Sequence, residues 1–546
     1  MIRTQFKSDL ALKVAMASLA LSLLFAARFP MVTDEAYYID WARAPDWPSL
    51  GFFDHPPVVS WIGALSRFSN HIFAARLGVW VCAVLTAFFT WRLAKKILPS
   101  SASTAAALFT SSIGGLASGF LLTPDAGLML AWSLALHEGF CALHANPKRW
   151  LTAGLATGFG ILSKYTMVLI GPVFLIALLR SPRQQLKSIW PYLGGVACLT
   201  VLLPHLWWQH NNDWITFRFQ LRHGLSIHHQ VYSRSELPRA NEALIGSSAY
   251  AAKDRLMTAM NDVQGFAEAI KKPKRQISRL ERAWQYIGDY IGGVAALWGG
   301  YALVGLISFV LKRIRPLPNK NTGHNSASLA LIKSSVLVPL VFFGLLSPFT
   351  KIEANWPAMH MMGLAVWIAV SRPINPKLIC SAFVLHVALF LSLGLILLKP
   401  DLLPQTRNNR LLLESRGFQS LGQWTQMNSS QMVLAVDSYQ LKSTLRFHAP
   451  NVEVLQWPGF TRDSEYTRGR DIDMALERKI RDQKNISVIS TSDTPMTIPG
   501  FEATSFRGIR VCSDGSIGIF SEADPRLPCE KGLREWWITE YTNQKP

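Results

Sequence analysis

The chain has 546 residues, of which 49% are hydrophobic and only 16% are charged. A soluble domain carries about 25% charged residues, and long uncharged runs recur here, so the composition excludes an ordinary soluble protein and predicts a polytopic membrane protein. The net charge of +20 does not indicate nucleic-acid binding, because much of it lies in short basic clusters beside apolar runs. Such clusters are typical of the cytoplasmic ends of membrane helices.

Long apolar runs predict about eleven membrane-spanning helices. The first run has basic residues before it and no small-residue cleavage site after it, so we interpret it as a retained helix with a cytoplasmic N-terminus. The predicted helices are 11–28, 72–94, 101–122, 124–144, 150–163, 165–180, 191–207, 290–311, 329–348, 355–371 and 377–398. The basic clusters then fall on the cytoplasmic side, and the segments left on the opposite side are 29–71, Leu122–Asp125, 208–289 and the tail.

This topology divides the chain into a transmembrane domain, residues 1–400, and a tail, residues 401–546. In the tail, short apolar runs alternate with a charged, helix-like stretch, which predicts a small periplasmic α/β domain. Cys512 and Cys529 both lie there and would face an oxidising compartment, so we predict a disulfide between them.

The external loop 29–71 has the densest group of reactive side chains. Asp34 and Glu35 directly follow the first helix, and Asp54 and His55 precede Pro56-Pro57 in the same loop. Such a group is typical either of a site for a reactive or charged ligand or of an ordinary solvated loop. The crowding of aromatic residues and the stiff proline pair favour a structured segment, so we interpret the loop as the catalytic loop.

Four further segments place polar side chains on the same side of the membrane. Asp125 begins the helix 124–144, where it could cap the helix or contribute to the site. Lys164 and Tyr165 interrupt an apolar stretch, and the lysine could either extend to the interface or bind a lipid phosphate.

The Trp-rich segment that contains Arg218 and Arg222 suits an interfacial belt and equally suits stacking on a sugar. Lys351, Glu353 and Asn355 precede the helix 355–371. The basic insertion within 208–289 is either a contact for anionic headgroups or a solvated helical segment.

Together these residues predict a lipid-facing site with a general base and cationic phosphate binders. Asp54 and His55 could in addition hold a divalent metal, or His55 could bind the phosphate directly. The reaction that needs such a set is group transfer from a phospholipid-type carrier. The sequence has no Walker loop, dinucleotide fingerprint or His-Glu-x-x-His motif, which disfavours hydrolysis of a soluble nucleotide.

The motifs Asp34-Glu35, Phe-Phe-Asp-His-Pro-Pro, Thr-Pro-Asp, Ser-Lys-Tyr, Phe-Arg-Phe-Gln and Glu-Ala-Asn-Trp-Pro resemble integral-membrane glycosyltransferases of the GT-C class. The resemblance covers roughly residues 10–400 and is greatest to bacterial family-39-like enzymes, which are related to protein O-mannosyltransferases and the lipid A aminoarabinose transferase. It implies that Asp34 is the catalytic base and that Asp125 matches a further aspartate of the class. It also implies that Asp54 lies near a metal and His55 near the carrier phosphate, although His55 stands where the aminoarabinose enzymes have lysine.

We therefore expect an enzyme of the bacterial inner membrane with a periplasmic active site. It would transfer a sugar from a polyprenyl-phosphate donor to a lipid, glycan or protein acceptor. The catalytic residues would be Asp34, Glu35 and Asp125, and the substrate-binding residues would be His55, Lys164, Tyr165, Arg218, Arg222, Lys351, Glu353 and Asn355. The alternative is a flippase for lipid-linked sugars, but its ionisable groups would lie near the middle of the bilayer, often in inverted repeats.

Overall fold

The structure is a computed structural model of the chain, and it forms two compact units. The residues that it describes are 2–225, 278–303, 326–371, 374–398, 415–428, 434–468, 471–521, 526, 528–529 and 532–544. The first unit comprises residues 1–29, 41–226 and 277–392, and the second comprises 30–40, 227–276 and 393–546. Most of the predicted insertion within 208–289 therefore lies outside the described residues.

The first unit is helical. Its α-helices are α1 (Ile2–Arg28), α3 (Val58–Ile62), α4 (Ile72–Ile97), α5 (Ala102–Thr110), α6 (Ile113–Ala117), α7 (Pro124–His144), α8 (Arg149–Ser163), α9 (Ile170–Leu179), α10 (Arg183–Lys187), α11 (Trp190–Asn211), α12 (Ile215–Leu225), α14 (Arg279–Trp298), α16 (Ser326–Leu346), α17 (His360–Ser371) and most of α18 (Pro376–Leu398). Short 3-10 turns cover Ala64–Arg67, Pro99–Ser101 and Tyr165–Leu169.

Several of these helices are long and apolar enough to cross a membrane. Within the described residues, five meet this criterion: Leu10–Arg28 of α1, α4, α7, α16 and most of α18. Each coincides with a predicted span, because a long apolar run specifies such a helix without reference to the rest of the fold. The apolar helices Tyr165–Leu179 and α17 are shorter. A polytopic membrane protein is thereby confirmed, and the number of eleven spans stays a prediction.

Two predicted helices differ from the structure. The helix expected over 101–122 is broken, because Ser112 begins a new helix by accepting a hydrogen bond from the Gly115 N–H at 3.0 Å. The helix expected from residue 290 begins earlier, at Arg279. There Ser278 and Glu281 form a capping box, and such a box marks a helix start that hydropathy alone does not detect.

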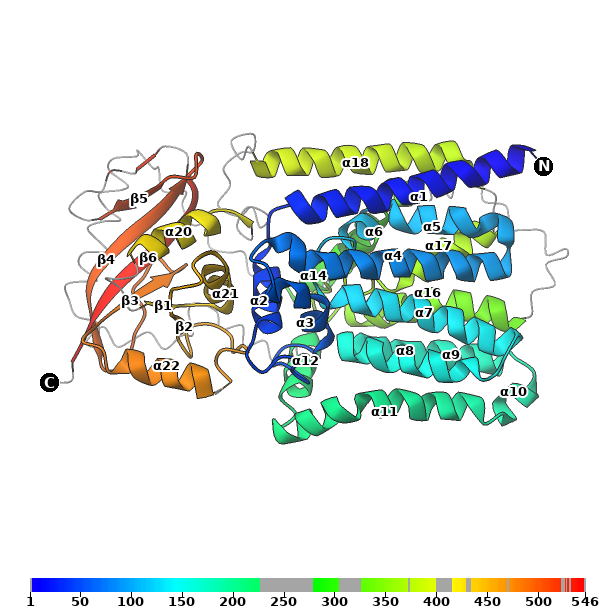
Figure 1. The fold of residues 1–546 in the computed structure, drawn as a ribbon, viewed down its shortest axis with the longest axis horizontal. Helices are drawn as coiled ribbons and strands as arrows, with labels where there is room; N and C mark the ends of the chain where they lie inside the picture. Colours follow the sequence, from blue (N-terminus) through cyan, green and yellow to red (C-terminus); the bar gives the residue numbers. More distant parts are fainter. Residues whose placement is uncertain are drawn as a thin grey trace. The chain divides into compact units, whose positions relative to one another are not determined.

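The core of the helical unit surrounds α7. This helix is buried along most of its length, with Leu128 and Trp132 fully enclosed, and α4, α7, α8 and α11 run side by side (Figure 1). Gly154 allows α8 and α11 to approach closely, since a Cβ at this position would lie 1.9 Å from the carbonyl oxygen of Gly194.

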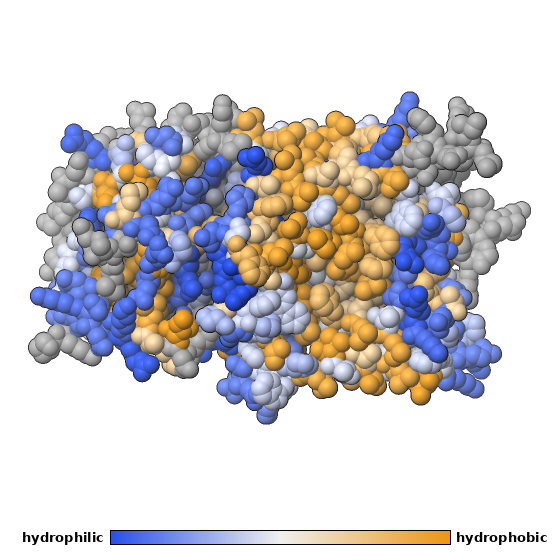
Figure 2. Space-filling view, viewed as in Figure 1, coloured by the Kyte–Doolittle hydropathy of each residue, from blue (hydrophilic) through white to orange (hydrophobic). Residues whose placement is uncertain are grey.

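The surface of the helical unit agrees with a membrane environment. Figure 2 shows an apolar face over these helices, with hydrophilic residues at the end where the basic helix α10 lies. Large apolar side chains such as Leu85 and Phe88 of α4 and Leu199 and Leu203 of α11 are exposed. An extended apolar surface of this kind suits lipid contact.

The second unit contains a six-stranded mixed sheet with the strand order β2-β1-β3-β6-β4-β5. Its strands are β1 (Leu434–Val436), β2 (Val454–Gln456), β3 (Asn485–Ser490), β4 (Phe501–Cys512), β5 (Ile517–Phe520) and β6 (Gly532–Asn543). The first three strands are parallel, and the pairs β3–β6, β6–β4 and β4–β5 are antiparallel. Helices α20 (Phe418–Asn428), α21 (Tyr439–His448) and α22 (Asp471–Arg481) complete the α/β arrangement (Figure 1).

Helices cover both faces of this sheet. Alternate residues of β1 point to opposite cores: Leu434 and Val436 join α20 and α21, whereas Ala435 joins the core that contains Ile480 of α22. Cys512 at the end of β4 forms a disulfide with Cys529, with Cα atoms 6.1 Å apart. The described part of the tail is thus an α/β fold, and its periplasmic location stays a prediction.

The second unit also includes the start of α2 (Thr33–Ala42). This helix lies within the segment that the sequence indicated only as a structured loop. It carries Asp34 and Glu35 in its first turn.

Candidate functional site

In the helical unit, Asp125 joins three helix ends. Its Oδ1 accepts a hydrogen bond from the Lys164 ammonium at 2.7 Å, and its Oδ2 accepts one from the Asn355 amide at 2.6 Å. Lys164 ends α8, and Asn355 precedes α17. The interpretation of Asp125 as a helix cap is wrong, because Thr123 occupies the N-cap and Asp125 lies in the first turn of α7. The carboxylate thereby becomes available to bind the lysine.

The Asp125–Lys164 pair is largely buried, with side-chain exposures of 10% and 12%. Removing two charges from water is costly, and only close pairing with further hydrogen bonds offsets that cost. The amide of Asn355 supplies such a bond. The sequence predicted an anionic partner for Lys164, and in the structure this partner is a protein carboxylate; phosphate binding by Lys164 stays a prediction.

In the helical unit, the part of the predicted catalytic loop around residues 50–52 is tied to α11 and α12 through its backbone. The carbonyl of Leu50 accepts a hydrogen bond from His205 Nδ1 at 2.6 Å, and that of Phe52 accepts one from the Thr216 hydroxyl at 2.6 Å. Gly51 is required between them, since a Cβ there would lie 2.4 Å from the Trp208 ring. The Trp-rich segment therefore positions this loop, a function that its composition did not reveal.

Tyr165 belongs to the same scaffold. Because Nδ1 of His205 donates to a carbonyl, its Nε2 accepts the Tyr165 hydroxyl at 2.8 Å. Gln209 donates to the Tyr165 hydroxyl at 3.1 Å, and the Tyr165 ring stacks on Phe217 with centroids 4.4 Å apart. These contacts orient the loop, and the predicted role of Tyr165 in substrate binding is not tested by them.

Asp54 and His55 lie next to α12. Asp54 is buried, its carbonyl accepts a hydrogen bond from Gln220, and the same amide lies 3.4 Å from His55 Nδ1. Within the described part of the chain, no group of three or more His, Cys, Asp or Glu side chains could hold a metal ion. The metal site predicted at Asp54 and His55 stays a prediction, and we assign no step to a metal.

The remaining predicted site residues of this unit are more exposed. Arg218 is exposed and donates to the Asp213 carbonyl at 3.2 Å, and Lys351 pairs with Glu353 at 3.4 Å with both side chains about half exposed. The side chain of Arg222 lies outside the described part of the structure. The structure thus joins Asn355 and Lys164 through Asp125, whereas Lys351 and Glu353 pair with each other.

In the second unit, the two predicted carboxylates of α2 have different surroundings. Glu35 is buried and accepts the backbone N–H of Val32 at 3.0 Å, which stabilises the first turn of the helix. Asp34 is exposed, and its Oδ1 accepts a hydrogen bond from the Tyr439 hydroxyl at 3.1 Å. Of the two, Asp34 has the accessibility that a general base needs, and a catalytic role of Glu35 stays a prediction.

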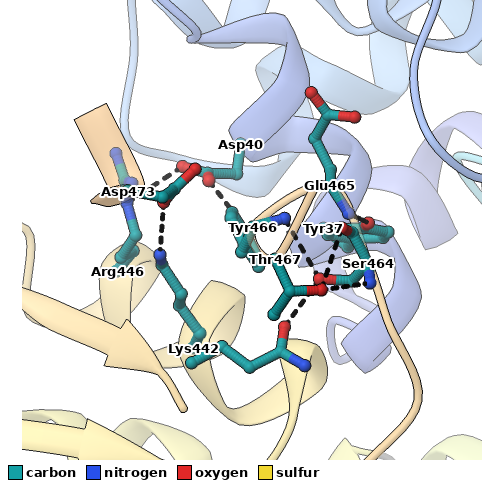
Figure 3. A network of polar contacts seen from close by, with 10 residues as sticks. Tyr37, Asp40, Lys442, Arg446, Ser464, Glu465, Tyr466, Thr467 and Asp473 are labelled. Carbon is teal, nitrogen blue, oxygen red and sulfur yellow. Dashed lines mark hydrogen bonds and ion pairs between the residues drawn. The ribbon is translucent and has the colours of Figure 1, made fainter. Parts of the chain in front are cut away.

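The sequence did not identify a polar network on the same helix (Figure 3). The Asp40 carboxylate accepts the Tyr466 hydroxyl at 2.7 Å and lies 3.2 Å from the Arg446 guanidinium, and the Tyr37 hydroxyl accepts the Glu465 N–H at 2.7 Å. The spacing of Asp34, Tyr37 and Asp40, three residues apart, is the available signal, because residues at this spacing share one side of a helix.

Comparisons with known proteins agree with this fold. Residues 54–208 match the family model described as dolichyl-phosphate-mannose-protein mannosyltransferase. The lipid A galacturonosyltransferase RgtD of Rhizobium johnstonii is 27% identical over 211 residues, which are 36% of this chain and 44% of that protein. An undecaprenyl phosphate-alpha-4-amino-4-deoxy-L-arabinose arabinosyl transferase of Edwardsiella ictaluri is 26% identical over 198 residues, which are 34% of this chain and 36% of that protein. The matched part therefore spans less than half the length of these relatives.

The similarity to a solved structure extends over nearly the whole chain. ArnT from Cupriavidus metallidurans, in a crystal structure with undecaprenyl phosphate, aligns with a TM-score of 0.55 and 12% identity over 96% of this chain and 97% of that one. At this identity the alignment establishes the fold. Together with the apolar helices, these relatives indicate a multi-pass protein of the bacterial inner membrane. The resemblance to GT-C glycosyltransferases that the motifs indicated is thereby confirmed, and the chain has the polytopic fold of that class.

Proposed function

We propose that the protein transfers a sugar from a polyprenyl-phosphate carrier to an acceptor, and that the acceptor is a lipid of the lipid A type. The observation that carries this proposal is the buried Asp125–Lys164–Asn355 cluster at the helix ends of a GT-C fold. A lysine held at such a position can neutralise the phosphate of a membrane-embedded donor. The relatives that act on lipid A and on an undecaprenyl-phosphate sugar support the choice of donor and acceptor.

In the proposed reaction, the acceptor hydroxyl oxygen attacks the anomeric carbon of the sugar. The new C–O bond forms as the bond from that carbon to the phosphate oxygen breaks, and the electron pair leaves with the polyprenyl phosphate. The carboxylate of Asp34 takes the hydroxyl proton and later releases it to water. The exposure of this side chain supports the role.

The other predicted site residues have separate tasks in this proposal, and Asp125, predicted as catalytic, is assigned a positioning role. Both oxygens of Asp125 accept hydrogen bonds, so we assign this residue to holding Lys164 in place, and Lys164 to the donor phosphate. His55 remains a candidate second phosphate ligand, and Arg218, Arg222 and Lys351 remain candidate substrate-binding residues. A protein or glycan acceptor is the alternative to lipid A.

We further propose that the active site and the α/β domain are periplasmic. The basic helix α10 would then lie at the cytoplasmic end of the helical unit, and the Cys512–Cys529 disulfide suits an oxidising compartment. In intact spheroplasts, both cysteines should react with an impermeant maleimide only after reduction. Labelling that requires a permeabilised membrane would overturn this orientation.

Transfer is tested with the full-length protein in detergent. Lipid A is incubated with an undecaprenyl-phosphate donor that carries either 4-amino-4-deoxy-L-arabinose or galacturonic acid, and mass spectrometry follows the gain of one sugar and the release of undecaprenyl phosphate. Comparison of lipid A, glycans and periplasmic glycoproteins between the parent strain and a strain without the protein identifies the natural pair. Movement of the lipid-linked sugar across the membrane of vesicles that contain the protein, without transfer to an acceptor, would instead establish flippase activity.

A further inference from the structure

The edge of the sheet at which α/β proteins commonly bind ligands is occupied here by α2. Tyr439 follows β1, and Glu465 and Tyr466 follow β2, so all three lie beyond the carboxyl ends of parallel strands. In open α/β sheets this edge is the usual place for a ligand. In this unit the groups found there bind side chains of the helix that carries Asp34.

The contacts align α2 with α21. Tyr439, at the start of α21, binds Asp34 near the start of α2, and Arg446, in the last turn of α21, pairs with Asp40. Six residues of one helix and seven of the other both correspond to about 10 Å of rise, so both contacts can form at once with the two helices running in the same direction. Two contacts almost two turns apart fix the position of α2 along its axis.

Buried groups hold the partners of α2 in place. The Lys442 ammonium, with 1% of its side chain exposed, lies 2.9 Å from the Asp473 carboxylate and 4.2 Å from the centre of the Tyr466 ring. Burial lowers the pKa of Lys442, and Asp473 opposes this shift. A buried lysine needs such partners. The contact with Lys442 therefore fixes the Tyr466 ring, whose hydroxyl binds Asp40 (Figure 3).

Two neighbouring side chains pack against the Tyr439 ring. The Tyr37 ring centroid lies 4.6 Å from that of Tyr439, and the Arg462 guanidinium lies 4.2 Å from it. The hydroxyl is then directed to Asp34 with few torsions left to vary. A carboxylate that must accept a proton from one direction gains from such a fixed orientation.

We propose that the α/β domain takes part in catalysis by orienting the base: Tyr439 is a positioning residue for Asp34, and Tyr466 and Arg446 anchor α2 through Asp40. This inference rests on the proposed glycosyl transfer. The α/β domain is accordingly an integral part of the catalytic unit, and substitution of one hydroxyl in it changes turnover.

The activity test compares Tyr439→Phe with Tyr541→Phe in the full-length protein. Tyr541 is likewise a buried tyrosine of the same domain, and its hydroxyl donates to the Met496 carbonyl at 2.6 Å. We expect Tyr439→Phe to lower kcat roughly 10- to 100-fold with the donor KM within about twofold of the parent value, because the hydroxyl acts on the orientation of the base. Tyr541→Phe should retain the parent kcat.

A second measurement does not depend on activity. Hydrogen exchange of residues 30–40 should become about tenfold faster when Tyr466→Phe and Arg446→Gln are combined, since a hydrogen bond and an ion pair to Asp40 are lost. Tyr541→Phe should leave this exchange unchanged. Parent-like exchange in the combined variant would refute the anchoring of α2.

Assays of Asp34→Asn separate the positioning role of Tyr439 from the proposed glycosyl transfer. If Asp34→Asn is inactive and Tyr439→Phe turns over like the parent, the positioning role is refuted and the proposed function stands. If the parent protein transfers no sugar from either donor, the proposed function fails, and the catalytic role of Tyr439 fails with it.

Discussion

The two units place an aspartate in opposite surroundings. In the helical unit, Asp125 is buried and both of its oxygens accept hydrogen bonds, one from an ammonium and one from an amide. In the α/β unit, Asp34 is exposed and accepts a neutral tyrosine hydroxyl. A carboxylate between strong donors is suited to holding a cation, whereas an accessible one beside a neutral donor is suited to receiving a proton.

The difference also separates stability from activity. A buried charge that loses its partner destabilises the fold, but an exposed carboxylate can be neutralised with little change in stability. We therefore expect substitutions at the two aspartates to have different consequences: loss of turnover in a folded protein for Asp34, and loss of stability together with weaker donor binding for the Asp125 pair.

The largest effect is expected for Asp34→Asn. This change removes the proton acceptor while preserving the size of the side chain, so turnover should fall about 10²- to 10⁴-fold with less than about 0.5 kcal/mol change in stability. Asp482→Asn is the matched control, because Asp482 is an exposed carboxylate of the same unit. Turnover in detergent and thermal unfolding are measured together, and parent-like turnover of Asp34→Asn would remove it from the mechanism.

The pair in the helical unit provides the next test. Lys164→Met leaves the buried Asp125 carboxylate without its cation and should destabilise the unit by about 3 kcal/mol. Removing both charges, in Lys164→Met with Asp125→Asn, should recover much of that stability. The donor KM should remain raised at least tenfold in both variants if Lys164 binds phosphate. Recovery of the KM in the double variant would reduce Lys164 to a structural partner.

Local sequence signals predicted the parts of the fold that depend on local chemistry. The runs that became α4, α7 and α16 are long enough to specify a span by hydropathy alone. In the tail, the predicted helix-like stretch became α22 and the apolar run Ile486–Ile489 lies in β3. The break after Thr110 was missed, since a single serine cap decides it within an otherwise apolar segment.

The sequence proposed residues for the candidate site, whose roles stay predictions, but it did not indicate which of them are in contact. The contacts Asp125–Asn355 and Asp34–Tyr439 join residues 230 and 405 positions apart, and no periodic pattern records such pairings. The motif that contains His55 was noticed because reactive side chains cluster in the sequence. Tyr439 was missed because it stands in an ordinary amphipathic stretch.

Removal of the disulfide tests whether the α/β unit can lose stability without a change in the helical unit. Replacing Cys512 and Cys529 by Ala opens a loop of 17 residues and should lower the stability of this unit by about 3 kcal/mol on the loop-entropy estimate. Hydrogen exchange in β4 and β6 should accelerate roughly 100-fold, whereas exchange in α7 should not change. Reductant should reproduce the effect in the parent and in a Cys82→Ala control, and an unchanged parent would show that the bond does not support the domain.

The smallest effect, a pH dependence, arises at His448 in the α/β unit. Its side chain packs against Gly422, where an added Cβ would lie 2.4 Å from that of His448, and burial lowers the pKa of His448 to about 4. An unfolded histidine titrates near 6.5. Between these values the unfolded chain binds a proton that the folded one does not, so this contribution to stability is complete above about pH 6.5 and is lost as the pH falls toward 4. Full burial would correspond to about 3 kcal/mol. Because the side chain is only partly buried, water screens part of this penalty, and we expect about 1–2 kcal/mol.

Unfolding of the full-length protein between pH 7 and 4 should show this pH dependence of stability in the parent and in the exposed control His210→Gln, and a weaker one in His448→Gln. Equal slopes in all three proteins would assign the acid sensitivity to other groups.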